Sequence, residues 1–127
     1  MKVLLDTNAF LIPVQFGVDL VRELEGIFGA CELLTLEGVV RELRGIGSGK
    51  GRDAPAARVG LGLAGRCTVL PSPEGGPRDV DSEVIRVAED AGCVVVTNDR
   101  ALRNSLLEKG LGVVTLRGRK RLEFIRG

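Results

Sequence analysis

The sequence predicts an α/β fold, a three-layer α/β/α sandwich around a central, mainly parallel sheet. Short aliphatic runs recur along the 127 residues, and longer segments with helical periodicity separate them. The clearest run, "CVVVT" at 93–97, is almost continuously apolar, which is typical of a strand buried on both faces. Valine-rich strands separated by helices indicate a parallel sheet that helices cover on both sides.

The first half of the chain contains two predicted strands and three predicted helices. The first strand, "KVLL", runs directly into Asp6. In the next helical segment the apolar residues recur at helical spacing, and Gly29 can end that helix. Thr35 is predicted to cap the helix after it, and "GIGSGKGRD" is a loop by composition. The predicted strands are 2–5 and 32–35, and the predicted helices are 18–28, 36–46 and 54–65.

The second half alternates strand and helix more regularly. Gly92 and Gly110 can end its two helices, and "PSPEGGP" at 71–77 is a predicted loop. After a last core strand, residues 117–127 are predicted to form a basic tail, and 1–127 is predicted to be one domain. The predicted strands are 67–70, 93–97 and 112–116, and the predicted helices are 80–92 and 99–110.

Composition restricts the chemistry that this chain can perform. The sequence has no histidine, which excludes Ser-His-Asp and Cys-His nucleophilic sites and histidine-ligated zinc. Its three cysteines are widely spaced and indicate small buried residues in a reducing compartment. No apolar run is long enough for a membrane span, so we expect a cytoplasmic protein without a membrane partner. Sites built from carboxylates favour hard cations such as Mg²⁺ or Mn²⁺.

Acidic side chains follow two of the predicted strands. Asp6 comes directly after the strand at 2–5, and Asp99 follows the strand at 93–97, with Asn98 before it. In parallel sheets, ligands bind outside the carboxyl ends of the strands, so both aspartates should lie at one edge. Like charges that are gathered together repel one another unless a cation holds them. Each aspartate alone could equally cap the helix that follows it.

Two further acids are candidates for the same edge. Asp81 begins the helix at 80–92, and Glu42 borders the apolar face of the helix at 36–46. Asp81 could instead complement the helix dipole, and Glu42 could be a surface acid paired with a nearby arginine. Asp79 and Glu83 flank Asp81, and either could assist or replace it, although we expect Glu83 to be exposed on the helix surface.

Four segments in this order resemble the motifs of PIN-domain endoribonucleases. They are "LLDTNAFL", "VVRELR", "VDSEVIRVAEDAG" and "VVVTNDRALR", and the resemblance covers residues 1 to 116. It implies a PIN-like fold and a catalytic, metal-binding set consisting of Asp6, Glu42, Asp81 and Asp99. Asn8 and Thr97 match the accessory polar positions of the family, and Asn98 is counted with them as a supporting residue. Ser82 stands where many relatives carry a second aspartate.

The resemblance implies Mg²⁺- or Mn²⁺-dependent hydrolysis of RNA that leaves 5′-phosphate and 3′-hydroxyl ends. The chain looks most like single-domain archaeal proteins akin to the rRNA-processing PIN nuclease of the small-subunit processome. VapC-type toxins are the near alternative. The RNA partner would be rRNA or tRNA-like, and the protein partner an antitoxin or a ribosome-assembly factor. A homodimer is common among such relatives. A non-catalytic RNA-binding or assembly module is the alternative from a different functional class.

The basic residues gather in two regions although the net charge is only +1. One region surrounds the glycine-rich loop and the other lies near the C-terminal end. Contact with RNA phosphates and ordinary solvated surface charge are both open interpretations of these regions. The candidate RNA-binding residues are Arg41, Arg44, Lys50, Arg52, Arg117, Arg119, Lys120 and Arg121.

Three other phosphate-handling classes fit the sequence less well. The loop "GIGSGKGR" departs from a phosphate-binding P-loop because Gly51 follows Lys50 and because the loop follows a helix. A phosphoaccepting receiver domain would require paired acids after the first strand, where Asp6 stands alone. A phosphatase of the haloacid-dehalogenase class would require a second aspartate at Asn8.

Overall fold

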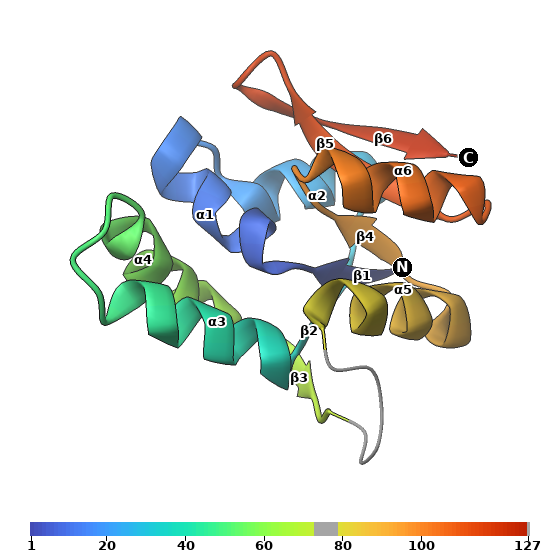
Figure 1. The fold of residues 1–127 in the computed structure, drawn as a ribbon. Helices are drawn as coiled ribbons and strands as arrows, with labels where there is room; N and C mark the ends of the chain where they lie inside the picture. The colour runs from blue at the N-terminus through green and yellow to red at the C-terminus, as the bar shows by residue number, and fades with distance from the viewer. Residues whose placement is uncertain (73–78, 127) are drawn as a thin grey trace.

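A six-stranded sheet forms the centre of the computed structural model, which describes residues 1–72 and 79–126 (Figure 1). The strand order is β3-β2-β1-β4-β5-β6, and all neighbours are parallel except β5 and β6, so the predicted mainly parallel sheet is confirmed. The strands are β1 (Lys2–Leu5), β2 (Glu32–Leu36), β3 (Thr68–Leu70), β4 (Val94–Val96), β5 (Gly112–Arg117) and β6 (Arg121–Arg126). Residues 73–77 of the predicted loop at 71–77 lie outside the described residues.

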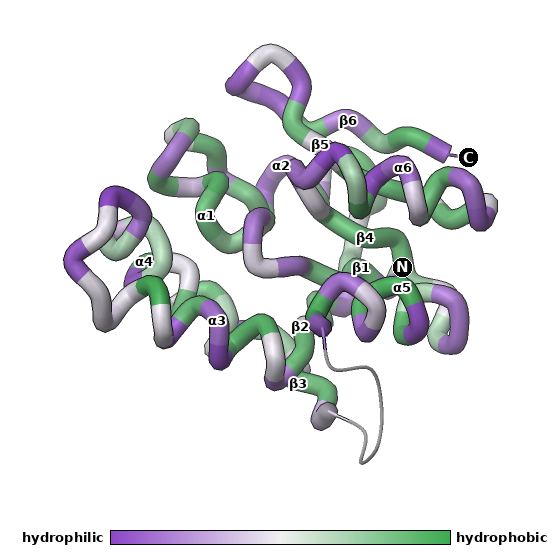
Figure 2. The backbone as a smooth tube through the Cα atoms, viewed as in Figure 1, coloured by the Kyte–Doolittle hydropathy of each residue, from purple (hydrophilic) through white to green (hydrophobic). Residues whose placement is uncertain are grey.

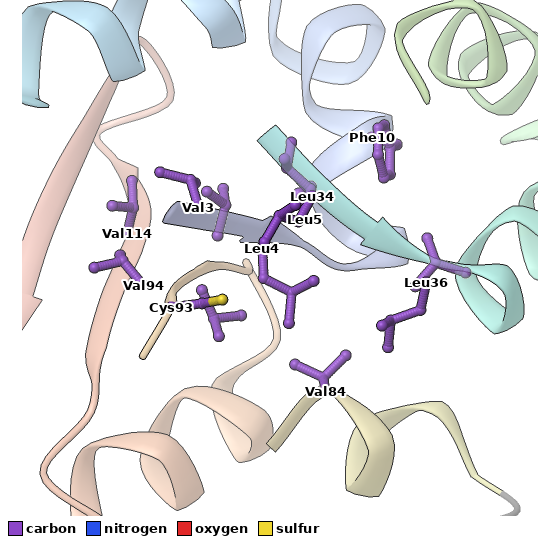
Figure 3. Close-up of a cluster of buried hydrophobic side chains, with 14 of the residues drawn as sticks. Val3, Leu4, Leu5, Phe10, Leu34, Leu36, Val84, Cys93, Val94 and Val114 are labelled. Carbon is purple, nitrogen blue, oxygen red and sulfur yellow. The ribbon is translucent and has the colours of Figure 1, made fainter. Parts of the chain in front are cut away.

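Helices cover both faces of this sheet, as the three-layer prediction requires. Helix α1 packs on α3 and α4, whereas α5 packs on β4 and α6. Figure 3 shows Phe10 of α1 and Val84 of α5 on opposite sides of β1. None of the described helices is long and apolar enough to cross a membrane. The helices are α1 (Thr7–Phe16), α2 (Leu20–Phe28), α3 (Glu37–Gly47), α4 (Ala54–Ala64), α5 (Val80–Ala91) and α6 (Arg100–Glu108).

The core lies along the two central strands. Val3, Leu4 and Leu5 of β1 are fully buried, and so are Val95 and Val96 of β4. Figure 2 shows these strands as mostly hydrophobic, whereas hydrophilic and hydrophobic residues alternate along the helices. Because successive side chains of a strand point to opposite faces, an unbroken apolar run fills both layers of the core.

The order of the strands reverses between β1 and β4. From β1 the chain moves outward to β2 and β3, and then it returns on the other side of β1 to form β4 and β5. The carboxyl ends of the two strands at such a reversal border the crevice where open α/β sheets bind ligands. The amide of Asp6 donates to the carbonyl of Val96 over 3.3 Å, so the two strand ends meet directly.

Helix α1 was not among the predicted elements. Asp6 caps it, and Gly17 ends it with a left-handed φ of 65°. Its buried residues, Ala9 to Ile12, are consecutive, so the segment lacks the amphipathic period that indicates a surface helix. Pro13 inside the helix weakens the sequence signal further.

The prediction that Thr35 caps a helix is wrong. Thr35 belongs to β2, is fully buried, and donates its hydroxyl to the carbonyl of Leu5 over 2.9 Å. Helix α3 begins two residues later, after Leu36, with no side-chain cap. The hydroxyl therefore links two neighbouring strands rather than starting a helix.

The prediction of a tail after a last core strand at 112–116 is also wrong. Strand β5 extends to Arg117, and β6 returns antiparallel to it up to Arg126. Phe124 packs edge-to-face on Phe28 of α2, with ring centroids 5.1 Å apart. The amide of Leu122 donates to Glu23 of α2 over 3.1 Å. The arginines of β6 obscured the alternation of its apolar residues in the sequence. This strand pairs with β5 and packs on α2.

Candidate active site at the carboxyl edge of the sheet

Asp6 occupies the point where β1 ends and α1 begins. Its side chain is 3% exposed, and both carboxylate oxygens accept a hydrogen bond. Oδ1 accepts from the amide of Ala9 over 2.8 Å, which caps the helix, and Oδ2 accepts from the hydroxyl of Thr97 over 2.5 Å. The predicted helix cap and the predicted position at the sheet edge are therefore both present in one residue.

Burial raises the pKa of Asp6 from its ordinary value of 3.8 to about 7. The bonds from Thr97 and Ala9 lower this pKa, while the charges of Asp81 and Asp99 raise it. Removing water from a carboxylate disfavours its charged form, and neighbouring anions disfavour it further. The structure thus brings Asp6, Asp81 and Asp99 within electrostatic reach of one another.

Thr97 connects the ends of β1 and β4. It is fully buried, donates its hydroxyl to Asp6, and accepts from the amide of Asp99 over 3.1 Å. Asp99 in turn caps α6, because its Oδ1 accepts from the amide of Leu102 over 2.9 Å. One threonine therefore orients the side chain of one aspartate and the backbone of the other.

Asp79 and Asp81, at the start of α5, have different surroundings. Asp79 caps the helix by accepting from the amide and the hydroxyl of Ser82, each over 2.8 Å, and these bonds lower its pKa. Asp81, in the first turn, has a raised pKa because of partial burial and the charges of Asp99, Asp79 and Glu42. Of these two acids, Asp81 is the one that faces the cluster around Asp6.

A cavity of about 330 Å³ opens beside Asp6. Glu42 of α3 reaches it and accepts a hydrogen bond from the hydroxyl of Thr7 over 2.5 Å. Thr7 and Asp53 were not among the predicted site residues. Thr7 is 35 positions from Glu42, and Asp53 ends a loop, so no local pattern marks either residue. The polar lining of the cavity consists of Asp6, Thr7, Asn8, Glu42, Asp53 and Asp81.

This donor set fits a hard divalent cation. Among residues 1–72 and 79–126, no three acidic or cysteine side chains already stand close enough to hold one metal ion as they are placed. The residues at the edge offer carboxylate oxygens. Burial is the main cause of the raised pKa of Asp6 and Asp81, and the mutual repulsion that adds to it is what a bound cation would relieve. Asp81 and Glu42 are both exposed, whereas Asp6 is buried.

Glu83 is buried, contrary to the prediction that it lies on the helix surface. It is 4% exposed, and within the described part of the chain its Oε1 has no hydrogen-bond partner. Glu83 lies one helical turn before Val87, on the face of α5 that packs inward with Val84. It lines a different cavity, of about 650 Å³, together with Glu42 and Asp79.

The predicted supporting and basic residues either line a cavity, pair with another side chain or are exposed. Asn8 lines the acidic cavity, whereas Asn98 is exposed. Arg41 donates to the hydroxyl of Ser72 over 3.3 Å, and Arg117 pairs with Glu123 over 3.5 Å. Arg52 and Arg119 line one further cavity together, while Arg44, Lys50, Lys120 and Arg121 are exposed.

Comparison with known structures gives three proteins of the same fold. The PIN domain endonuclease Utp24 superposes with a TM-score of 0.81 at 21% identity, covering 99% of this chain and 92% of that one. A domain of a functionally unknown protein from Methanocaldococcus jannaschii gives 0.67 at 18% identity, covering 92% and 91%. VapBC2 from Rickettsia felis, bound to a DNA fragment from its promoter, gives 0.65 at 14% identity, covering 92% and 100%.

Comparison of sequences identifies the family as well as the fold. The chain is 31% identical over 118 residues to Ribonuclease VapC9 of Archaeoglobus fulgidus, which covers 92% of this chain and 84% of that protein. Residues 3–119, which include all four acids of the predicted set, match the family described as PIN like domain. The chain therefore belongs to the PIN-like domain family.

Proposed function

We propose that this protein is a metal-dependent endoribonuclease that hydrolyses RNA phosphodiester bonds at the carboxyl edge of its sheet. The observation that carries the proposal is the buried carboxylate of Asp6, whose pKa of about 7 reflects burial and the nearby charges of Asp81 and Asp99. Membership of the PIN-like domain family and the likeness to a protein named a ribonuclease support the substrate class.

Asp6, Asp81, Asp99 and Glu42 would hold one or two Mg²⁺ or Mn²⁺ ions. When bound, such an ion supplies an activated water and stabilises the charge that develops on the phosphate. Thr97 keeps Oδ2 of Asp6 in a fixed direction through its hydroxyl. Glu42 would either join these ligands or act as a base instead: Thr7 holds its Oε1, and its Oε2 would then orient the attacking water.

The test is cleavage of end-labelled RNA with Mg²⁺ or Mn²⁺ by the native chain, Asp6→Asn and Asp99→Asn. We expect each variant to lose activity by about 100-fold or more, since loss of a mere support of a metal ligand already costs about 10- to 100-fold. Asp90→Asn is the matched control, because Asp90 pairs with Arg86 on the exposed side of α5. Equal activity in all four proteins would remove the proposal and favour the non-catalytic RNA-binding module.

Two biological settings fit this activity. Processing of rRNA is the setting that the motif resemblance implies, and a VapC-type toxin with an antitoxin partner is favoured by the 31% identity to VapC9. Sequencing of RNA ends in cells that express the native chain or Asp6→Asn separates them. New ends confined to precursor rRNA support the first setting. Ends in tRNA-like or other RNA, with growth arrest that a neighbouring gene product relieves, support the second.

A further inference from the structure

A second hollow lies at the C-terminal end of α1. Its volume is about 700 Å³, and three segments far apart in the sequence contribute to its lining. Figure 1 shows the end of α1 between the α3–α4 connection and the tip of the β5–β6 hairpin. The lining residues on which the inference rests are Gln15, Phe16, Arg52, Asp53, Pro55 and Arg119.

Asp53 joins this hollow to the acidic cavity. It lines both, and its Oδ1 accepts a hydrogen bond from Nε2 of Gln15 over 3.0 Å. The two hollows thus follow α1 from Thr7 at its start to Phe16 at its end, a span of roughly 14 Å at the rise of an α-helix. A polymer whose scissile bond lies at Asp6 would extend along this path.

The two hollows differ in charge. The acidic cavity gathers carboxylates, which repel the phosphates of a nucleic acid, so binding energy must come from cations placed beyond it. Arg52 and Arg119 supply such cations, and neither takes part in the ion pairs of the described residues. The second hollow also lies at the start of α4, where the helix dipole adds positive potential.

The apolar part of the lining suits a base rather than phosphate alone. Phe16 is half-buried and aromatic, and bases of single-stranded RNA stack on aromatic side chains. The Asp53–Gln15 pair offers hydrogen-bonding groups beside it. An aromatic ring and two arginines that line one hollow form a combination that can hold one unpaired nucleotide.

The backbone of Arg119 adopts a conformation that costs free energy for a residue with a Cβ atom. Its φ of +70° is the only positive φ of a non-glycine residue in the described ranges. A side chain in this conformation is unfavourable, and glycine would adopt it freely. The hairpin nevertheless carries an arginine there, at the rim of the hollow.

We infer that the hollow at the end of α1 is a nucleotide-binding subsite for single-stranded RNA, in which Arg52 and Arg119 hold phosphates and Phe16 stacks on a base. The inference rests on the proposed function and names its substrate class. The subsite lies beside the scissile phosphate and fixes the direction in which the strand crosses the acidic cavity.

Binding, measured without cleavage, tests the subsite. Fluorescence anisotropy of a labelled RNA strand of about ten nucleotides is recorded at several salt concentrations, with the native chain in EDTA and with Asp6→Asn. Arg52→Gln and Arg119→Gly should each weaken binding and reduce the slope of log K against log salt by about 0.7, the contribution of one phosphate contact. Phe16→Leu should weaken binding by roughly fivefold or more with an unchanged slope. Arg22→Gln, at an exposed position of α2, is the charge-matched control and should change neither quantity.

Arg119→Gly also separates binding from folding. Because glycine relieves the positive φ, its unfolding midpoint should equal or exceed that of the native chain while its RNA binding falls. The inference is overturned if all three arginine variants behave alike, if Arg52→Gln and Arg119→Gly bind normally, or if a duplex of the same sequence binds as tightly as the single strand. Failure of the catalytic proposal looks different: RNA binds through Arg52 and Arg119, but no metal supports cleavage.

Discussion

Asp6 caps a helix and carries a buried acid at the same time, and these roles need not coincide. The cap needs only an acceptor at Oδ1 for the amide of Ala9. An asparagine would satisfy that amide without burying a charge. The choice of aspartate therefore adds a charge that the fold alone does not require.

The first prediction concerns the pH dependence of Asp6→Asn in EDTA. The folded pKa of about 7 exceeds the ordinary 3.8, so the native state keeps a proton that the unfolded state loses. Native stability should consequently fall as pH rises from about 4 to 7, by an amount on the order of 4 kcal/mol. Urea unfolding should show Asp6→Asn more stable than the native chain at pH 8 but not at pH 4.

Asp19→Asn is the control for that measurement, because Asp19 caps α2 from an exposed position. A difference between native chain and Asp6→Asn that is the same at both pH values would contradict the assigned cause.

The second prediction concerns Thr97. Thr97→Val keeps the shape but removes the hydroxyl that Asp6 and Asp99 share, at a stability cost of roughly 1–3 kcal/mol. Since the Thr97 bond lowers the pKa of Asp6, its loss should move the acidic limb of the cleavage pH profile upward. Thr97→Ser should restore the profile. An unshifted profile with reduced activity would mean that Thr97 is only structural.

At the scale of elements, the site depends on how closely α1 approaches α4. A Cβ built at Gly60 of α4 would lie 2.7 Å from the carbonyl oxygen of Phe10, whereas one at Gly62 would meet nothing within 4 Å. Helix α1 is the element that carries Thr7 at one end and Phe16 at the other. Its position on α4 therefore holds Phe16 beside the start of α4, where both line the second hollow.

The third prediction compares these two glycines. Gly62→Ala should stabilise the protein by roughly 0.5–1 kcal/mol through helix propensity alone. Gly60→Ala should instead destabilise it, since the overlap is with backbone and overpacking costs about 1–3 kcal/mol. Urea unfolding of the two variants measures both. A Gly60→Ala variant as stable as Gly62→Ala would mean that α1 can move away from α4 freely.

At the scale of the whole molecule, the parallel topology brings the acids together. Asp6, Glu42, Asp81 and Asp99 follow β1, β2, β3 and β4 respectively, each at or within the helix after its strand. The parallel arrangement brings the carboxyl ends of these four strands, and so the starts of the helices after them, to one edge of the sheet. Their repulsion is shared by the fold as a whole, so relieving it should stabilise the whole fold.

The fourth prediction follows from that coupling. Adding Mn²⁺ or Mg²⁺ at about 100 times its dissociation constant should stabilise the native chain by about 2.7 kcal/mol. Thermal unfolding should show this shift in the native chain, and EDTA should abolish it. Asp6→Asn and Asp99→Asn should show little or none, while Asp90→Asn should respond fully. A shift of equal size in all four proteins would place the ion elsewhere.

The sequence predicted the layers, the strands β1 to β5 and the acids at the strand ends, because an apolar run followed by an acid is a local pattern. It did not predict α1, because the consecutive buried residues of this helix lack a helical period. Nor did it reveal Thr7 or Glu83, because the bond of Thr7 to Glu42 and the burial of Glu83 depend on helices that meet only in the folded chain. The residues of β6 were dominated by their charge, which obscured the alternation of Leu122 and Phe124.

The contact of β6 with α2 has a consequence for self-association. An open strand edge invites another chain to add a strand, and proteins resist this by shortening, charging or covering their edges. Here the amide of Leu122 is already bonded to Glu23, arginines stand at both ends of β6, and the opposite edge strand β3 spans only three residues. These features therefore disfavour the addition of a strand from a second molecule at either edge of the sheet.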